Sequence, residues 1–196
     1  MSIALAKRTP DHEILPLFLQ RWSPRAMSSE RISEEELMQL FEAARWAPSS
    51  YNEQEWRYVY AARETDHWDT LFSLLVEANQ AWCKNASHLV LVASRNSFAR
   101  NGNPNRVHSF DTGASFQNFA LQGASMNLVV HGMAGFNYEE ARTALAIPET
   151  YSVEAMIAIG RPGTIEDLPE SFRDSEVPSL RNPLSAFIAE GHFPFS

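Results

Sequence analysis

The sequence of 196 residues predicts a single domain of the α+β class, covering residues 1–196. Three observations support this class. One amphipathic helix is clearly delimited, two near-continuous apolar runs are typical of buried strands, and the predicted helices and strands follow one another without strict alternation. Apolar residues make up 44% of the chain and charged residues 20%, which is the range of an ordinary globular protein. We therefore expect one folded domain rather than a disordered chain.

The clearest helix is predicted over residues 33–46. Ser33 can cap its N-terminus, and Glu36 three residues later completes a capping box. Pro48 ends it, because the residue before a proline is disfavoured in the α region. Apolar residues at i, i+3, i+4 and i+7 form one buried stripe, namely Leu37, Leu40, Phe41 and Ala44.

Periodicity and turn residues predict the other elements in the same way. Gly123 weakens an isolated helix by about 1 kcal/mol relative to alanine, so the long helix that contains it should pack closely against another helix at the centre of the structure. Gly135 should end this helix in a left-handed conformation. In chain order we expect a strand at 56–62, a helix at 66–76, a strand at 88–94, a polar loop over a site at 95–107, helices at 109–132 and 138–146, and a strand at 155–160.

The C-terminal segment 161–196 is rich in proline. Proline cannot donate a backbone hydrogen bond and interrupts helices and central strands. The segment is therefore predicted to be an extended arm rather than a packed element. Its prolines are Pro162, Pro169, Pro178, Pro183 and Pro194.

Charge and cysteine content exclude several classes of protein. The formal net charge is −8, which argues against a nucleic-acid partner and against an anionic membrane surface. Cys83 is the only cysteine, so the chain can form no internal disulfide, and a reducing compartment fits best. The first residues contain no apolar stretch typical of a secretory signal, and no window approaches 18 consecutive apolar residues. We expect a cytoplasmic protein with no membrane segment.

Residues 21–25, RWSPR, place one arginine on each side of a serine. Pro24 favours extended geometry at the preceding residue, and in an extended segment residues 21, 23 and 25 point the same way. Two guanidinium groups and a hydroxyl would then converge on one spot, which suits a phosphate monoester. The alternative is that Arg21 and Arg25 both pair with surface carboxylates.

The loop after the first helix is rich in hydroxyl and carboxamide groups. Asn52 and Gln54 both donate and accept hydrogen bonds, and such groups suit a planar heterocycle with alternating carbonyl and N–H groups, such as the dione edge of a flavin. The alternative is a turn whose side chains satisfy their own backbone. The loop comprises Pro48, Ser49, Ser50, Tyr51, Asn52, Glu53 and Gln54.

Other chemistries have weaker support in the residues. The six histidines include no i, i+4 pair, so a zinc site is not indicated, and we expect no bound metal. The sequence contains neither G-x-G-x-x-G nor G-x-x-x-x-G-K-[ST], so no Rossmann fingerprint or P-loop is present. It also contains no G-x-S-x-G, although a serine triad cannot be assessed from composition.

Taken in order, the motifs resemble the nitroreductase family. RWSPR is followed by a capped helix that ends in APSSYNEQEW, and later segments agree with the family's central strand, long helix, last strand and C-terminal arm. Those segments are NASHLVLVASR, DTGASFQNFALQGASMNLVVHGMAGF, AMIAIGRP and SLRNPLSAFI. The resemblance covers nearly the whole chain.

The resemblance implies an FMN-dependent nitroreductase-like fold, with a central, mainly antiparallel sheet surrounded by helices. It also implies an intertwined homodimer with FMN sites at the subunit interface, where residues 161–196 reach across the partner. The implied FMN-binding residues fall into three groups. These are Arg21, Trp22, Ser23, Arg25 and Arg181 for the phosphate and ribityl chain, Pro48, Ser49, Ser50, Asn52 and Gln54 for the loop laid against the flavin by the other subunit, and Asn79, Ala134 and Gly135 for the ring.

Three positions depart from the family's usual pattern. Trp82 stands where many members have a lysine, Ser179 stands where many have a second basic residue, and Glu55 replaces the proline of Q-P-W. The first change affects how charge on the reduced flavin is stabilised. The second removes one cation from the phosphate site.

As to function, the resemblance implies an oxidoreductase in which NADH or NADPH reduces FMN by hydride transfer to flavin N5. An electron-poor small-molecule acceptor, such as a nitroaromatic or a quinone, would then enter the same space in a ping-pong cycle. The flavin carries the chemistry, so no catalytic side chain is expected. The alternatives are a non-redox FMN-binding or storage protein and a specialised flavin-fragmenting or dehalogenating relative.

Overall fold

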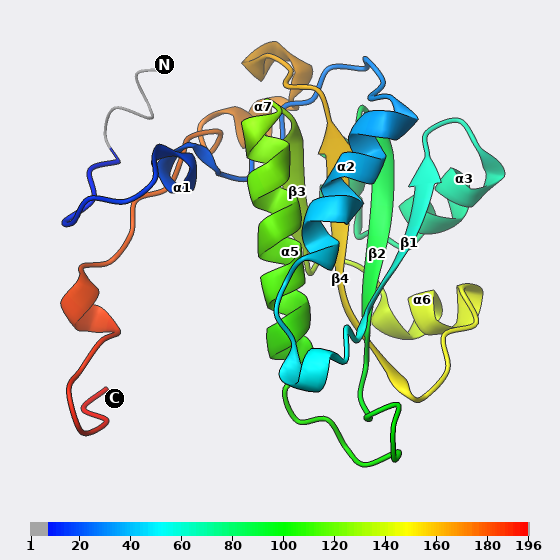
Figure 1. The fold of residues 1–196 in the computed structure, drawn as a ribbon. Coiled ribbons are helices and arrows are strands. Elements are labelled where there is room, and N and C mark those ends of the chain that lie inside the picture. Colours follow the sequence, from blue (N-terminus) through cyan, green and yellow to red (C-terminus); the bar gives the residue numbers. More distant parts are fainter. Residues whose placement is uncertain (1–7, 196) are drawn as a thin grey trace.

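The computed structural model of the chain describes residues 8–195 and has a four-stranded sheet at its centre (Figure 1). Residues 1–7, part of the segment predicted to lack a secretory signal, lie outside the described residues. The strand order is β1-β2-β4-β3, and every neighbouring pair is antiparallel, which confirms the predicted α+β class and sheet type. The strands are β1 (Trp56–Ala62), β2 (His88–Arg95), β3 (Val129–Met133) and β4 (Tyr151–Gly160).

Helices cover both faces of the sheet (Figure 1). The central strand β2 is buried on both sides, because Val90 and Val92 belong to one apolar cluster and Leu89 and Leu91 to the other. This explains why its sequence is apolar throughout rather than alternating. The first cluster includes residues of α2 (Glu34–Arg45) and α5 (His108–Ser125), and the second includes residues of α3 (Asp66–Ser73), α4 (Glu77–Cys83) and α6 (Tyr138–Ala144).

The predicted helix at 33–46 is confirmed as α2. The Ser33 hydroxyl accepts a hydrogen bond from the Glu36 N–H at 3.2 Å, and the Glu36 carboxylate accepts one from the Ser33 N–H at 2.8 Å. Leu37, Leu40 and Ala44 are buried against α5 and the sheet. The capping box and apolar stripe therefore position the loop that follows α2 relative to α5.

The prediction of one helix over 109–132 is wrong. Helix α5 ends at Ser125, the chain turns at Asn127 with a left-handed φ of 54°, and residues 129–133 form β3 on the edge of the sheet. A Cβ added at Gly123 would lie 2.4 Å from Val130 Cγ2 on this strand and 3.8 Å from Leu40 Cδ2 on α2, so the glycine permits the close contact with β3. The predicted packing of this helix against another helix is also present, since residues of α2 and α5 share one apolar cluster. The helix predicted at 66–76 also ends earlier, at Ser73, and α4 follows it.

The two ends of the chain lie outside the sheet. Near the N-terminus α1 spans Pro16–Gln20. Residues 161–178 pack on the body, since Pro162 bridges to Met27 and Leu168 is buried, whereas most residues beyond Pro178 are exposed. The extended arm predicted over 161–196 is therefore shorter than expected, and Figure 1 shows its red end standing away from the sheet. Its first part contains η3 (Ile165–Asp167) and α7 (Glu170–Arg173), and its exposed part contains η4 (Leu184–Ala186).

None of the helices within residues 8–195 combines the length and the apolar character needed to cross a membrane.

Candidate functional site

The RWSPR segment begins with extended backbone geometry at Arg21 and lies between two cavities. Arg21, Ser23 and Arg25 line a cavity of about 310 Å³, to which Arg181 of the C-terminal segment also contributes. Trp22 contributes to the same cavity, and together with Pro24 it also lines a second one against the C-terminal end of α5. The predicted convergence of residues 21, 23 and 25 is therefore present in the fold.

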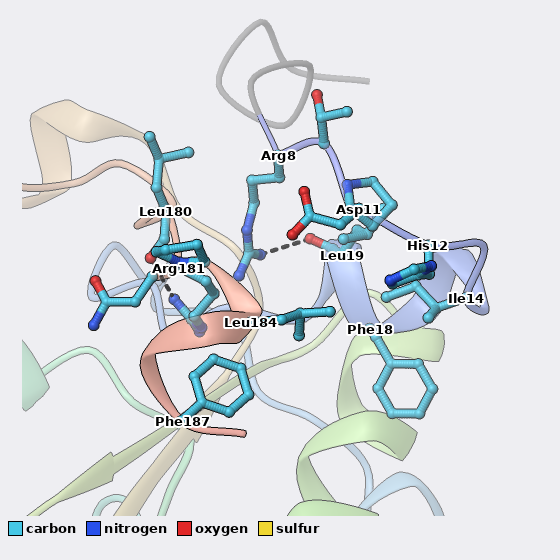
Figure 2. A pocket seen from close by; sticks show the side chains of 14 residues that line it. Arg8, Asp11, His12, Ile14, Phe18, Leu19, Leu180, Arg181, Leu184 and Phe187 are labelled. Carbon is cyan, nitrogen blue, oxygen red and sulfur yellow. Dashed lines mark hydrogen bonds between the residues drawn. The ribbon is translucent and has the colours of Figure 1, made fainter. Parts of the chain in front are cut away.

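Three arginines from distant parts of the chain lie close together. In the part of the chain that is described, Arg8, Arg21 and Arg181 have no carboxylate oxygen within 4.0 Å. Burial lowers the pKa of Arg21, and the positive charge of Arg181 lowers it further. Burial likewise lowers the pKa of Arg8, with smaller contributions from Arg181 and Arg21. Figure 2 shows Arg8 and Arg181 around one space between the two ends of the chain.

Arg25 has different surroundings from Arg21. One oxygen of the Glu176 carboxylate accepts hydrogen bonds from the backbone N–H groups of Arg25 and Ala26, at 2.7 and 2.8 Å. The other oxygen lies 4.0 Å from the Arg25 guanidinium. The sequence left open that both arginines pair with carboxylates instead of a phosphate. Among the described residues Arg25 has such a carboxylate partner, and Arg21 has none. The Glu176 contacts also fix the C-terminal segment to the RWSPR segment.

Arg181 is oriented by its own neighbours. Its Nη1 donates to the Ser179 hydroxyl at 2.9 Å and to the Leu180 carbonyl at 3.0 Å. Ser179, one of the three departures from the pattern of the resembling family, therefore supports Arg181 instead of adding a charge. Within residues 8–195 the other N–H groups of this guanidinium donate to no protein acceptor, and the residue is exposed, so these groups are accessible.

A second group of predicted residues meets between α4 and the segment that follows β3. Asn79 on α4 donates from Nδ2 to the Gly135 carbonyl at 3.0 Å and accepts from Trp82 Nε1 at 3.3 Å. A Cβ at Gly135 would lie 2.6 Å from Asn79 Nδ2, so the close approach explains the glycine. Its φ is not left-handed, and the predicted helix cap is wrong. Ala134, the residue before it, is exposed.

His131 on β3 joins these two groups. Its ring lies 4.6 Å from the Trp82 ring, its Nδ1 lies 2.9 Å from the Pro24 carbonyl oxygen, and the residue lines the cavity with the arginines. Burial lowers the pKa of His131, and the positive charge of Arg25 also contributes. Trp82 is itself buried, so the residue in the usual lysine position packs in the core and places no charge at the site.

The loop at 48–54 lies far from the arginines in the structure. The Ser50 N–H donates to the Asp111 carboxylate at 2.8 Å, which holds the loop at the first turn of α5. The RWSPR segment lies near Ala124, at the other end of this helix. Asp111 and Ala124 are 13 residues apart, which is about 20 Å along a helix. A single chain therefore does not bring this loop to the arginines.

Hydrogen bonds inside the loop use part of its polar groups. Ser49 Oγ accepts from the Gln54 N–H at 3.0 Å, and Gln54 Nε2 donates to the Asn52 carbonyl at 3.0 Å. The alternative of a self-satisfying turn thus holds for Ser49 and Gln54. The Ser50 hydroxyl and the Asn52 side chain have no hydrogen-bond partner among the described residues, and Pro48 begins the loop at an exposed position.

The backbone of this loop is strained. Tyr51, Asn52 and Gln54 have φ values of 54°, 57° and 51°, in the left-handed region that residues with a Cβ rarely adopt. Each such residue costs on the order of 1 kcal/mol or more, and such strain concentrates at functional sites. The strain therefore gives independent support to the loop as a functional element.

Comparisons with known proteins point to one protein family. The model of the nitroreductase family matches residues 18–72 and 61–161. A major NAD(P)H-flavin oxidoreductase of Aliivibrio fischeri is 34% identical over 76 residues, which are 37% of this chain and 34% of that protein. Protein DrgA of Synechocystis sp. is 27% identical over 74% of this chain and 80% of its own length.

Solved structures show the same fold. The crystal structure of an oxidoreductase containing FMN is 39% identical, with a TM-score of 0.92, and the match covers 96% of this chain and 97% of that one. A structure from Desulfovibrio desulfuricans in complex with FMN is 27% identical, with a TM-score of 0.71, and the match covers 94% and 100% of the two chains. With a family match over most of its length and these relatives, the chain belongs to the nitroreductase family.

Proposed function

We propose that the chain is an FMN-dependent oxidoreductase that uses NADH or NADPH to reduce electron-poor acceptors, such as nitroaromatics or quinones. The observation that carries this proposal is the group formed by Arg8, Arg21 and Arg181, which come from both ends of an acidic chain and have no carboxylate partner among residues 8–195. An anion at the cavity would offset their mutual repulsion. Relatives named for NAD(P)H-flavin oxidoreduction and neighbours that contain FMN indicate which anion.

The residues around the cavity fit a phosphate monoester. Such a group carries about −1.5 to −2 charges at neutral pH and offers three acceptor oxygens. Guanidinium groups bind these oxygens in bidentate fashion, and a hydroxyl can donate a further bond. Arg21, Ser23, Arg25 and Arg181 would hold the phosphate, with backbone groups of Trp22 beside the ribityl chain.

The ring of the flavin would lie toward Asn79, Ala134 and Gly135. Asn79 contacts Gly135 and is connected to the cavity through Trp82 and His131. The loop at 48–54 would come from a second copy of the chain, because in one chain it lies at the far end of α5. We therefore propose a homodimer with its FMN sites at the interface. The exposed apolar side chains of the arm support it, namely Leu180, Phe187, Ile188 and Phe193.

When bound, FMN supplies the redox chemistry, accepting a hydride from the nicotinamide and passing electrons to the acceptor. The chain's own residues bind and orient. The arginines fix the phosphate end, and Asn79 and the backbone near Gly135 offer polar groups at the ring end. No side chain needs to act as an acid or base, and we assign none.

A spectrum of the purified protein tests the proposal. We expect a yellow protein whose flavin absorbance bleaches when NADH or NADPH is added without oxygen and returns when a nitroaromatic or quinone follows. A bound flavin that stays oxidised with both nucleotides, while dithionite still bleaches it, would favour a storage role. Products that contain flavin fragments or released halide would favour the specialised relatives. A protein that takes up no added FMN would contradict all of these functions.

A further inference from the structure

Arg8 contacts the backbone that carries Arg21. Its Nη1 donates to the Leu19 carbonyl at 2.6 Å and to the Arg21 carbonyl at 3.1 Å, and Figure 2 shows the first of these bonds. These carbonyls lie at the C-terminal end of α1, where the last carbonyls of a helix lack intrahelical partners. The Arg21 N–H donates to the Leu17 carbonyl at 3.0 Å. The peptide groups on both sides of the Arg21 Cα are therefore held in place.

Arg8 also adds charge to the group. It is close enough to Arg21 and Arg181 for their positive charges to lower its pKa further, after burial. Asp11 lines the same space but lies more than 4.0 Å from the charged groups of Arg8, Arg21 and Arg181. Three guanidinium groups without a carboxylate repel one another, and an anion nearby converts this repulsion into attraction. Arg8 is therefore placed where it acts on a bound phosphate without lining the phosphate cavity itself.

We propose that Arg8 is a positioning residue for the phosphate of bound FMN. It fixes the backbone of Arg21 and supplies a third positive charge beside Arg181. This inference rests on the proposed function, since it concerns the same anion. It leads to a specific expectation, namely that Arg8 contributes to the affinity for FMN but little to the affinity for riboflavin, which has the same ring and ribityl chain and lacks the phosphate.

A purely structural role for Arg8 predicts something different. If Arg8 only held α1 in place, its loss would lower the affinities for FMN and for riboflavin by the same factor, because the whole segment would move. The ratio of the FMN affinity to the riboflavin affinity separates these roles. A general loss of structure lowers both affinities by the same factor and leaves this ratio unchanged.

The experiment measures dissociation constants of FMN and riboflavin for the full-length flavin-free protein, by quenching of flavin fluorescence. In Arg8→Ala the preference for FMN over riboflavin should fall about tenfold, the size expected for one positive charge near a partly desolvated phosphate. Arg8→Lys keeps the charge and should stay within about threefold of the original preference. Arg8→Gln, which keeps a donor but no charge, should behave like the alanine variant. If the alanine variant does not fold, the comparison of Gln with Lys replaces it.

Arg142→Ala is the matched control. Arg142 on α6 also donates to backbone carbonyls, those of Pro148 and Tyr151 at 3.0 Å each, but it does not line the phosphate cavity. Its loss should leave the preference unchanged. If Arg8→Ala lowered the affinities for FMN and riboflavin equally, or changed neither affinity, the proposed role of Arg8 would be overturned while the proposed function stayed intact. If the original protein bound neither flavin, the proposed function itself would fail.

Discussion

Arg21 and Arg25 are four residues apart and face the same cavity, but their charges are balanced differently. Glu176 lies beside Arg25 and accepts a hydrogen bond from its backbone N–H, whereas the charged groups near Arg21 within residues 8–195 are other arginines, and its Nη1 lies 3.5 Å from the Ser23 hydroxyl. A ligand anion should therefore bind more strongly to Arg21 than to Arg25, because no carboxylate among residues 8–195 pairs with the Arg21 guanidinium. Arg25 is held in place by the carboxylate and contributes to the cavity as part of an ion pair.

Replacing Arg21 with alanine should weaken FMN binding by about 2–5 kcal/mol, the range measured when one partner of a buried hydrogen-bonded charge pair is removed. Flavin content after purification and fluorescence titration would measure this loss. Arg173→Ala is a suitable control, because Arg173 donates to the Leu168 carbonyl and does not line the cavity. Unchanged flavin content in Arg21→Ala would contradict the assignment.

The sequence allowed some of these residues to be predicted and concealed others. Pro24 keeps its segment extended, so the common direction of residues 21, 23 and 25 follows from local geometry alone. Arg8 and His131 were missed because only tertiary structure brings them to the site. His131 lies on β3, a segment read as helix, and Arg8 lies in a segment without periodicity.

At the scale of elements, the loop at 48–54 and the loop at 95–107 meet over a buried acid. Glu55 is fully buried, its carboxylate accepts a hydrogen bond from Asn105 Nδ2 at 2.6 Å, and its other oxygen has no partner among the described residues. Burial raises the pKa of Glu55, and the nearby charge of Asp111 raises it further. The same Asp111 carboxylate accepts from the Ser50 N–H, so this acid pair connects both loops to α5.

The raised pKa sets the direction of a pH effect. A carboxyl group whose pKa is higher in the folded than in the unfolded chain contributes stability that is fully present below the unfolded pKa, about 4.3 for glutamate, and is lost as the pH rises through the folded value. Glu55→Gln cannot ionise, so it removes this decrease in stability at high pH, and its side-chain oxygen can still accept the hydrogen bond from Asn105. We therefore expect the variant to have a higher free energy of unfolding at pH 7–8 and little difference near pH 4.

Urea unfolding of the flavin-free protein at several pH values checks this expectation. Glu149→Gln is the control, because Glu149 is exposed and its side chain makes no hydrogen bond among residues 8–195. It should leave the stability nearly unchanged at every pH. A Glu55→Gln variant that is less stable than the original protein at pH 8 would show that the ionised carboxylate is needed.

The elements differ in how far local sequence determined them. Helix α2 was predictable because its caps and apolar stripe are encoded within the helix itself. Strand β3 was not, because the chain leaves α5 through a left-handed asparagine rather than a glycine or proline, and apolar residues stand directly on both sides of this asparagine. The left-handed φ values of Tyr51, Asn52 and Gln54 could not be predicted either, because none of the three is a glycine, the residue that most often marks such a conformation.

At the scale of the whole molecule, the two ends of the chain form both the proposed phosphate site and the proposed assembly surface. Arg8 and Arg21 come from the first segment and Arg181 from the last, while the residues after Arg181 turn away from the sheet with exposed apolar side chains (Figure 1). A second copy would cover these side chains and bring its 48–54 loop to the ring. This dimer, like the cytoplasmic location, stays a prediction.

Removing residues 182–196 separates assembly from phosphate binding, because the shortened chain keeps all four arginines of the site. We expect it to fail to form the flavin-bearing dimer, since the arm would no longer cover the second copy and the ring would lose the partner loop. Size-exclusion chromatography with light scattering, together with flavin content, would measure both properties. A shortened chain that remains a yellow dimer would remove the arm from the interface.

The central claim is that guanidinium groups from opposite ends of the chain bind a flavin phosphate. A crystal structure of the protein reconstituted with FMN tests it most directly. We predict that the phosphate oxygens lie within hydrogen-bond distance of both Arg21 and Arg181, with the ring beside Gly135. A bound FMN whose phosphate contacts neither arginine would contradict the account.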